Sequence, residues 1–99
     1  MIRHVITWKL AEAEPAKRGE VAAELAERLN ALPAAIPEIL SFEVGVNEVH
    51  ADVNWHVTLV STFDSFEALE VYSAHPVHQE LVAWVRPRVS ERAGVDFTV

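Results

Sequence analysis

The spacing of hydrophobic side chains in this 99-residue chain changes several times, and the order of these changes restricts the fold more than any other feature. Hydrophobic residues at every second position predict strands, whereas a spacing of three or four residues predicts helices. The predicted strands are 2–10, 40–47, 54–63 and 95–99, and the predicted helices are 16–32 and 64–86. The order β-α-β-β-α-β predicts one α+β domain over residues 1–99 with a ferredoxin-like fold, in which both helices cover one face of a four-stranded antiparallel sheet.

The first strand and the first helix have the clearest patterns. Alternation places one set of first-strand side chains on an apolar face: Ile2, His4, Ile6, Trp8 and Leu10. The helix has an apolar stripe made of Val21, Leu25, Leu29 and Leu32. We expect Pro33 to end this helix, because proline has no amide hydrogen to donate.

Glycines mark the other strands. Gly45 lies inside the second strand and is a candidate bulge site, and Gly94 precedes the expected final strand. In the third strand, alternation predicts that Trp55 and Val57 face inward and that His56 faces the opposite way.

The second helical stretch is interrupted. Asp64, followed three residues later by Glu67, predicts a capping box at its start. Pro76 then breaks the pattern, and a second helical segment begins with this proline as its first residue. In one continuous helix Tyr72 and His78 would lie about 240° apart around the axis. The break therefore allows the phenol and the imidazole to turn toward one pocket.

Composition excludes several classes of partner. The formal net charge of −7 disfavours nucleic acid and anionic membrane surfaces. The chain has no cysteine, which excludes disulfides and thiol chemistry. It shows no signal segment and no apolar run near 20 residues, so we expect a cytoplasmic protein that does not bind membranes.

The second face of the predicted sheet is partly apolar. Val5, Thr7 and Val60 would lie on it, away from the helices. A semi-apolar sheet of this size needs a cover, and a second copy of the chain is the simplest one. We therefore predict a homodimer in which the sheets pack face to face.

Three segments resemble a known family. The start Arg-His-Val-Ile-Thr-Trp-Lys-Leu (3–10), the block Tyr-Ser-Ala-His-Pro-Val-His (72–78) and the closing Val-Asp-Phe (95–97) are similar to the stress-responsive α/β-barrel (Dabb) family. The resemblance implies a dimeric α+β barrel. Most members have no assigned activity, and the clearest enzyme among them is the plant olivetolic acid cyclase, which closes a linear tetraketide by aldol condensation without a cofactor.

The resemblance also implies site residues. The acid/base histidine of the cyclase matches His78, its partner tyrosine matches Tyr72, and its first-strand pocket histidine matches His4. Val57 stands where the cyclase has another pocket histidine, which weakens any transfer of the substrate. The predicted catalytic residues are thus His78 and Tyr72, and the predicted substrate-binding residues are His4, Trp8, Val57 and His75.

The chemistry of the pair agrees with this assignment. An imidazole can remove an acidic C–H proton, and a phenol can donate to the oxyanion that develops. A hydrophobic or aromatic small molecule is the expected ligand, and Trp8 could form an aromatic wall for it. No cofactor is expected, and His75 and His78 lack the third ligand that a metal site would need.

Other interpretations stay open. Tyr72 and His78 could simply close the helix over the sheet, and His75 could bond backbone groups at the helix junction. The protein would then be a non-enzymatic stress-response or assembly protein. A cofactor-free monooxygenase or a haem-handling barrel would keep the fold and change the chemistry.

Overall fold

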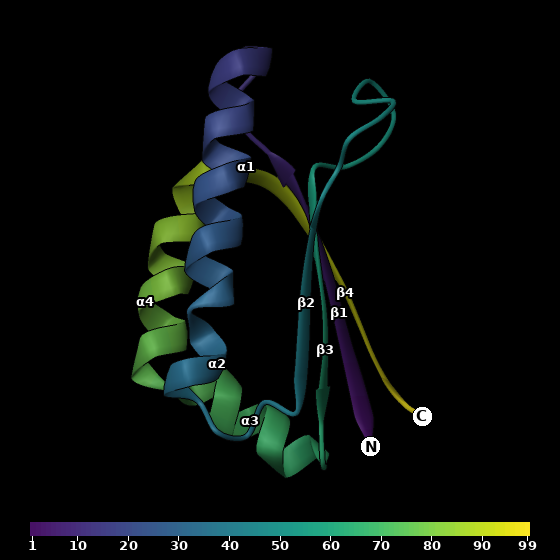
Figure 1. Cartoon of the computed structure of the whole chain (residues 1–99), viewed down its shortest axis with the longest axis vertical. Coiled ribbons are helices and arrows are strands. Elements are labelled where there is room, and N and C mark those ends of the chain that lie inside the picture. Colours follow the sequence, from purple (N-terminus) through teal and green to yellow (C-terminus); the bar gives the residue numbers. More distant parts are fainter.

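The computed structural model describes all 99 residues and arranges them in two layers, with the helices on one side of a single sheet (Figure 1). In chain order the elements are β1 (Ile2–Leu10), α1 (Pro15–Asn30), α2 (Leu32–Ala35), β2 (Ser41–Val46), β3 (Val57–Phe63), α3 (Phe66–Ala74), α4 (Pro76–Val85), a 3-10 turn η1 (Arg86–Arg88) and β4 (Val89–Thr98). None of the helices has both the length and the apolar character that crossing a membrane would require.

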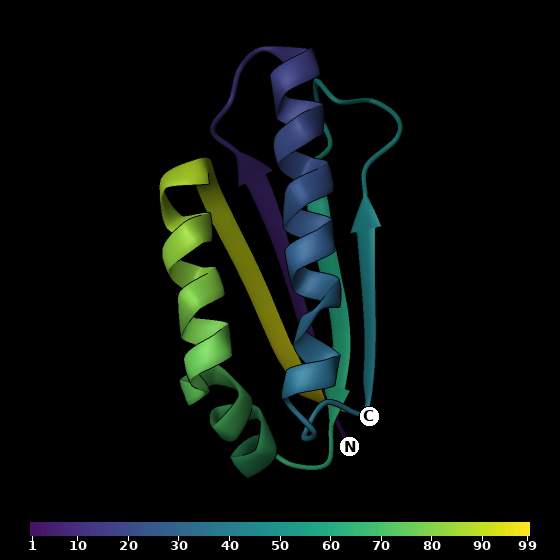
Figure 2. The same cartoon turned by 60° about the vertical axis from the view of Figure 1, so that its left-hand side comes forward.

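The sheet is antiparallel with the strand order β2-β3-β1-β4 (Figure 2). The central strand β1 pairs with both β3 and β4, so that Val5 lies opposite Val60 on one side and Val95 on the other. The two termini lie side by side, and the Val99 amide donates to the Met1 carbonyl over 3.0 Å. The ferredoxin-like α+β fold predicted from the sequence is confirmed.

The core lies between the helices and the inner face of the sheet. All five residues predicted for the apolar face of β1 are buried, and so are Leu25, Leu29 and Leu32 of the predicted helical stripe. From β3 the core receives Val57, Leu59 and Phe63. Trp55 lies before β3 begins and is only half-buried.

The last strand is longer than predicted. It begins at Val89 and contains Gly94, which the sequence pattern placed before the strand. A β-carbon on Gly94 would lie 2.8 Å from Cδ1 of Ile6, so a side chain here would push against the core. The first part of the strand was missed because β4 is an edge strand and almost all of its residues are exposed, which removes the alternation that marks a buried strand.

Two other local predictions were wrong. The pairing of β2 with β3 runs in regular register through Gly45, and the register shift in the sheet lies instead at Lys9 and Leu10 against β4. Helix α1 ends at Asn30, before Pro33. Pro33 lies in the first turn of the short helix α2, where a missing amide hydrogen costs nothing because that amide has no helical acceptor.

Helix α3 is capped by Ser65 and not by Asp64 as predicted. The Ser65 hydroxyl accepts a hydrogen bond from the Ala68 amide at 3.1 Å. Replacing Ser65 with alanine removes this acceptor, so we expect the free energy of unfolding to fall by about 1 kcal/mol in urea denaturation. Asp64→Ala is the control and should change it much less. Equal losses in the two variants would contradict the assignment of the cap.

His56 joins the start of β3 to the end of β1. Its Nδ1 accepts the Leu10 amide at 2.9 Å, and its own amide donates to the Trp8 carbonyl at 3.0 Å. Burial lowers the pKa of His56, and the positive charges of Arg18 and Lys9 act in the same direction. The folded state therefore favours the neutral imidazole.

This depressed pKa predicts how stability depends on pH. Above about pH 6.5 His56 is neutral in both the folded and the unfolded chain, and its contribution to stability is fully present. As the pH falls below that value the unfolded chain takes up the proton first, so stability falls until the folded pKa is reached. We expect the free energy of unfolding, measured by urea denaturation, to fall less between pH 7.5 and pH 5.5 in His56→Gln than in the unmodified protein. An unchanged difference would contradict this role.

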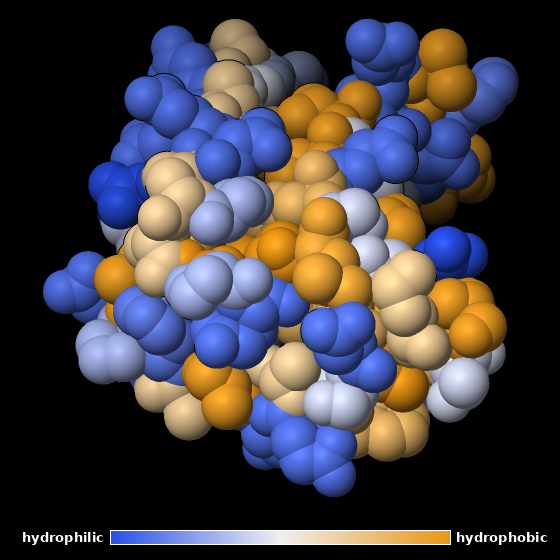
Figure 3. Space-filling model, turned by 60° about the horizontal axis from the view of Figure 1, so that its bottom comes forward, coloured by the Kyte–Doolittle hydropathy of each residue, from blue (hydrophilic) through white to orange (hydrophobic).

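The outer face of the sheet carries no helix. Val5 and Val60 are half-buried there, while Val95 is 61% exposed and Phe97 is 40% exposed. Seen from the end where both termini lie, the surface shows hydrophobic patches between hydrophilic groups (Figure 3). Val5, Val60, Val95 and Phe97 give the outer face of the sheet the partly apolar character predicted from the sequence.

Candidate functional site

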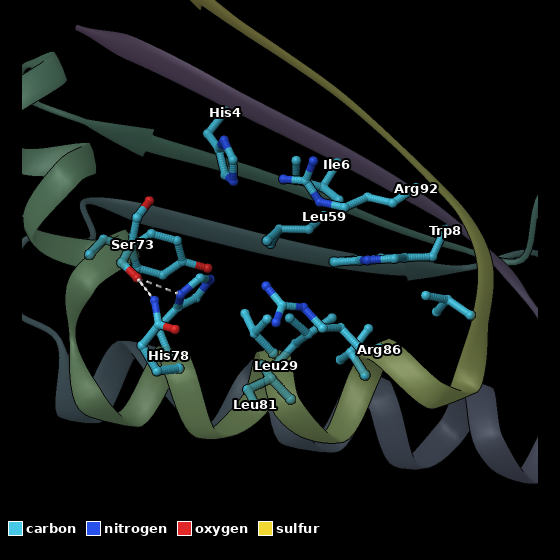
Figure 4. Close-up of a pocket in the computed structure, with 15 residues that line it drawn as sticks. His4, Ile6, Trp8, Leu29, Leu59, Ser73, His78, Leu81, Arg86 and Arg92 are labelled. Atoms are coloured by element: carbon cyan, nitrogen blue, oxygen red, sulfur yellow. Dashed lines mark hydrogen bonds between the residues drawn. The ribbon is translucent and has the colours of Figure 1, made fainter.

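A cavity of about 400 Å³ lies between the inner face of the sheet and the helices α3 and α4 (Figure 4). Nine of its 15 lining residues are hydrophobic, among them Leu59, Leu81 and Val85. The other six are His4, Ser73, His78, Gln79, Arg86 and Arg92, and Tyr72, one of the nine, adds a phenol hydroxyl. An apolar chamber with a few convergent polar groups is the usual form of a small-molecule site.

The break at Pro76 brings Tyr72 and His78 together. Helix α3 ends at Ala74, and α4 begins at Pro76 as predicted. The ring centroids of Tyr72 and His78 are 4.5 Å apart, and both residues line the cavity. One continuous helix would have pointed the two rings in different directions.

The same break orients the imidazole of His78. In a continuous helix the Ser73 carbonyl would accept the amide of Val77. That amide donates instead to Nδ1 of His75, which caps α4 at 3.1 Å. The Ser73 carbonyl is thereby left to pair with Nδ1 of His78 at 3.0 Å and with the side-chain amide of Gln79 at 2.6 Å.

This contact determines which nitrogen of His78 can act as a base. A carbonyl oxygen only accepts, so Nδ1 of His78 carries the hydrogen. In the neutral ring the lone pair is then on Nε2, on the side of the ring away from Ser73. Burial lowers the pKa of His78, and the charges of His4, Arg92 and His75 add to this against the opposing effect of the Ser73 contact. At neutral pH the imidazole is therefore free to accept a proton.

Tyr72 supplies a protonated phenol. Its side chain is only 1% exposed and packs against Phe63, with ring centroids 5.0 Å apart. Burial raises the pKa of Tyr72 above its usual value, although the positive charge of Arg92 opposes the shift. Because its pKa is raised, the phenol stays protonated and remains a hydrogen-bond donor in the range of pH where His78 is neutral.

His4 lies on the opposite wall of the cavity, and Asp96 supports it from the neighbouring strand without lining the cavity. The two residues face each other across β1 and β4, and Nδ1 of His4 contacts a carboxylate oxygen of Asp96. The ring of His4 lies 6.0 Å from that of Tyr72, centroid to centroid. The carboxylate accepts a hydrogen bond from Nδ1 of His4. The other ring nitrogen, Nε2, is therefore the one available to a ligand.

Not all of the other predicted site residues line the cavity. Trp8 is buried and lines the cavity, as does His4. Val57 is buried in the core but does not line the cavity, and His75 is the cap of α4 and also lies outside the lining. The structural role considered for His75 is observed at the helix junction.

Five polar residues that line or support the cavity were not predicted from the sequence: Ser73, Gln79, Arg86, Arg92 and Asp96. Asp96 had a detectable signal, since a lone carboxylate between Val95 and Phe97 in a strand calls for a polar partner. Neither arginine had such a signal in the sequence. Arg92 belongs to the part of β4 that the pattern missed, and Arg86 lies in the turn η1. No group of three or more His, Asp or Glu side chains converges in a way that would hold a metal ion.

Comparisons with known proteins agree with this description. The model of the stress-responsive A/B barrel domain family (Dabb) matches residues 2–99. A dimeric protein of unknown function with a ferredoxin-like fold from Bacteroides fragilis is 29% identical, with a TM-score of 0.87 over 99% of this chain and 95% of the other.

Two further solved structures are similar. A dimeric ferredoxin-like protein of unknown function from Thermobifida fusca is 26% identical, with a TM-score of 0.82 over 99% of this chain and 90% of the other. The hydroxynitrile lyase from Passiflora edulis shares the fold, at 15% identity and a TM-score of 0.79 over 99% of this chain and 92% of the other. Curated proteins provide no match. Because the family model spans nearly the whole chain, this protein belongs to the stress-responsive α/β-barrel (Dabb) family.

Proposed function

We propose that the protein is a cofactor-independent acid/base enzyme that closes or breaks carbon–carbon bonds in a small molecule by aldol chemistry. The observation that carries this proposal is the pairing of Tyr72 and His78 on one cavity, with the His78 tautomer set by the Ser73 carbonyl. A filled interior would have favoured a purely structural role. The cavity of about 400 Å³ has instead the size of a small-molecule pocket.

The reaction needs two functions from the protein. Nε2 of His78 removes a proton from a carbon next to a carbonyl, and the electron pair of that C–H bond forms an enolate. The Tyr72 hydroxyl donates a hydrogen bond to the enolate oxygen. The enolate carbon then attacks a second carbonyl of the same molecule, and the new alkoxide takes the proton back from His78.

The functional unit in this proposal is a homodimer. The similar proteins from Bacteroides fragilis and Thermobifida fusca are both described as dimeric. The uncovered apolar face with Val95 and Phe97 supports the same state, because a twofold pairing of the sheets would remove it from water. The cavity lies on the other side of the sheet, so dimer formation leaves it open.

Proton exchange tests the chemistry without knowledge of the natural substrate. With 4-oxo-4-phenylbutanoate in D₂O, we expect the protein to accelerate deuterium incorporation next to the ketone, as followed by proton NMR. The rate should fall at acidic pH with an apparent pKa below about 6.5, because the pKa of His78 is lowered.

Tyr72→Phe provides the matched variant. It keeps the ring and removes only the hydroxyl, so we expect exchange to slow by about 100-fold, the usual effect of losing one oxyanion donor. Exchange no faster than in buffer with the unmodified protein, or full activity in the phenylalanine variant, would contradict the proposal.

A further inference from the structure

Two arginines face the cavity without a partner in the chain. The side chains of Arg86, from η1, and Arg92, from β4, extend over the cavity toward its histidine end (Figure 4). The acidic partners in the four ion pairs of the chain are Asp96, Glu91, Glu14 and Glu24, and none of these pairs includes Arg86 or Arg92.

Neighbouring arginines show what a structural role looks like here. Arg28 pairs with Glu24 at 2.8 Å and lies over one side of the Trp84 ring at 4.4 Å. Arg88 lies over the same ring at 4.3 Å and donates to the Trp84 carbonyl. Both guanidinium groups are therefore used within the chain, unlike those that line the cavity.

The guanidinium group of Arg92 lies beside Gly94. Gly94 lies on the inner face of β4, two residues beyond Arg92 and opposite Ile6. A β-carbon on Gly94 would approach Nη1 of Arg92 to 3.5 Å and Nη2 to 3.7 Å. These are ordinary van der Waals distances, so they place the guanidinium group of Arg92 beside Gly94, on the inner face of β4 and toward His4 (Figure 4).

The charge of the cavity is one-sided. Its lining contains the two arginines and no aspartate or glutamate. Asp96, which lies opposite His4 on β4, is engaged by that histidine. An exposed guanidinium group in such a lining attracts an anion, and its planar donors match a carboxylate.

From these observations we infer that the cavity binds a substrate carrying a carboxylate, held by Arg86 and Arg92 while an apolar body fills the remaining space. The inference rests on the proposed function, since it places the carboxylate at the arginines and the reacting carbon at His78 and Tyr72. The positive charge beside these residues also stabilises the enolate that forms there.

Binding of a matched pair of probes tests the inference separately from catalysis. 4-Phenylbutanoate and 4-phenylbutanamide have nearly the same shape and differ in charge. By calorimetry we expect the unmodified protein to bind the acid about tenfold or more tightly than the amide, as for a charge-assisted hydrogen bond. Arg86→Gln combined with Arg92→Gln should bring the two affinities to within about twofold.

Two controls make the result specific. Lys17→Gln combined with Arg18→Gln removes the same charge from α1, away from the cavity lining, and should leave the preference for the acid intact. His78→Gln should slow exchange by at least about 100-fold and still bind the acid more tightly than the amide. Equal affinities for acid and amide, no measurable binding of the acid at about 10 mM, or an undiminished preference in the double arginine variant would each overturn the inference. In the first and third cases the unmodified protein would still exchange deuterium, so the proposed chemistry is judged independently of the preference for the acid.

Discussion

Replacing His78 with glutamine is expected to slow deuterium exchange of 4-oxo-4-phenylbutanoate by at least about 100-fold, the lower end of the range for general acid–base catalysis. Glutamine can still donate a hydrogen bond to the Ser73 carbonyl, which pairs with Nδ1 of His78 at 3.0 Å. It offers no basic nitrogen in place of Nε2. The effect should therefore be on the rate of proton transfer and not on folding.

The free energy of unfolding provides the second measurement on this variant. We expect it to change by no more than about 1 kcal/mol in urea denaturation at pH 7.5, as is usual when a functional residue is replaced without loss of packing. His50→Asn is the matched control, because His50 is exposed in the loop before β3 and asparagine tolerates its φ of 50°. A large loss of stability in His78→Gln with exchange intact would mark His78 as a structural residue.

Replacing Val5 with aspartate is expected to convert the proposed dimer into monomers. Val5 lies in the middle of the outer face, directly between Val60 and Val95. A carboxylate there would be buried without a partner in a face-to-face dimer, which costs several kcal/mol. We expect the dissociation constant to rise by at least about 100-fold, measured by analytical ultracentrifugation at micromolar concentration.

Two further variants separate dimerisation from folding. Val95→Asp places the same charge on the edge strand β4, where the residue is 61% exposed, and should also weaken the dimer. Val71→Asp changes a 50% exposed valine on helix α3 and should leave the mass unchanged. If Val5→Asp and Val95→Asp both remain dimeric and folded, the dimer does not use this face.

The sequence was sufficient for those parts of the fold in which burial is periodic. Alternation in β1 predicted the buried positions from Ile2 to Leu10, because a half-buried strand must repeat every two residues. Pro76 predicted the start of α4 for an equally local reason, since proline cannot donate to the preceding turn. The approach of Tyr72 and His78 followed from that break.

Local patterns failed where several neighbouring signals compete or where burial is absent. Ser65 and Asp64 are both good capping residues, and only the path of the chain into α3 decided between them. Most of β4 is exposed, so its first residues carry no hydrophobic period, and the strand exists because β1 offers it a partner along its length.

The candidate site depended on tertiary structure for its finer chemistry. His4 and Asp96 are 92 residues apart and meet only because β1 and β4 are paired in this register. Arg86 and Arg92 approach one cavity from a turn and from an edge strand. Their spacing along the sequence does not predict this arrangement. The sequence alone therefore determined the order of elements, the inner face of the sheet and the break in the last helix, which are set by contacts along the chain. Only the tertiary structure decided the partners and charge of the cavity, because pairing between distant strands brings those groups together.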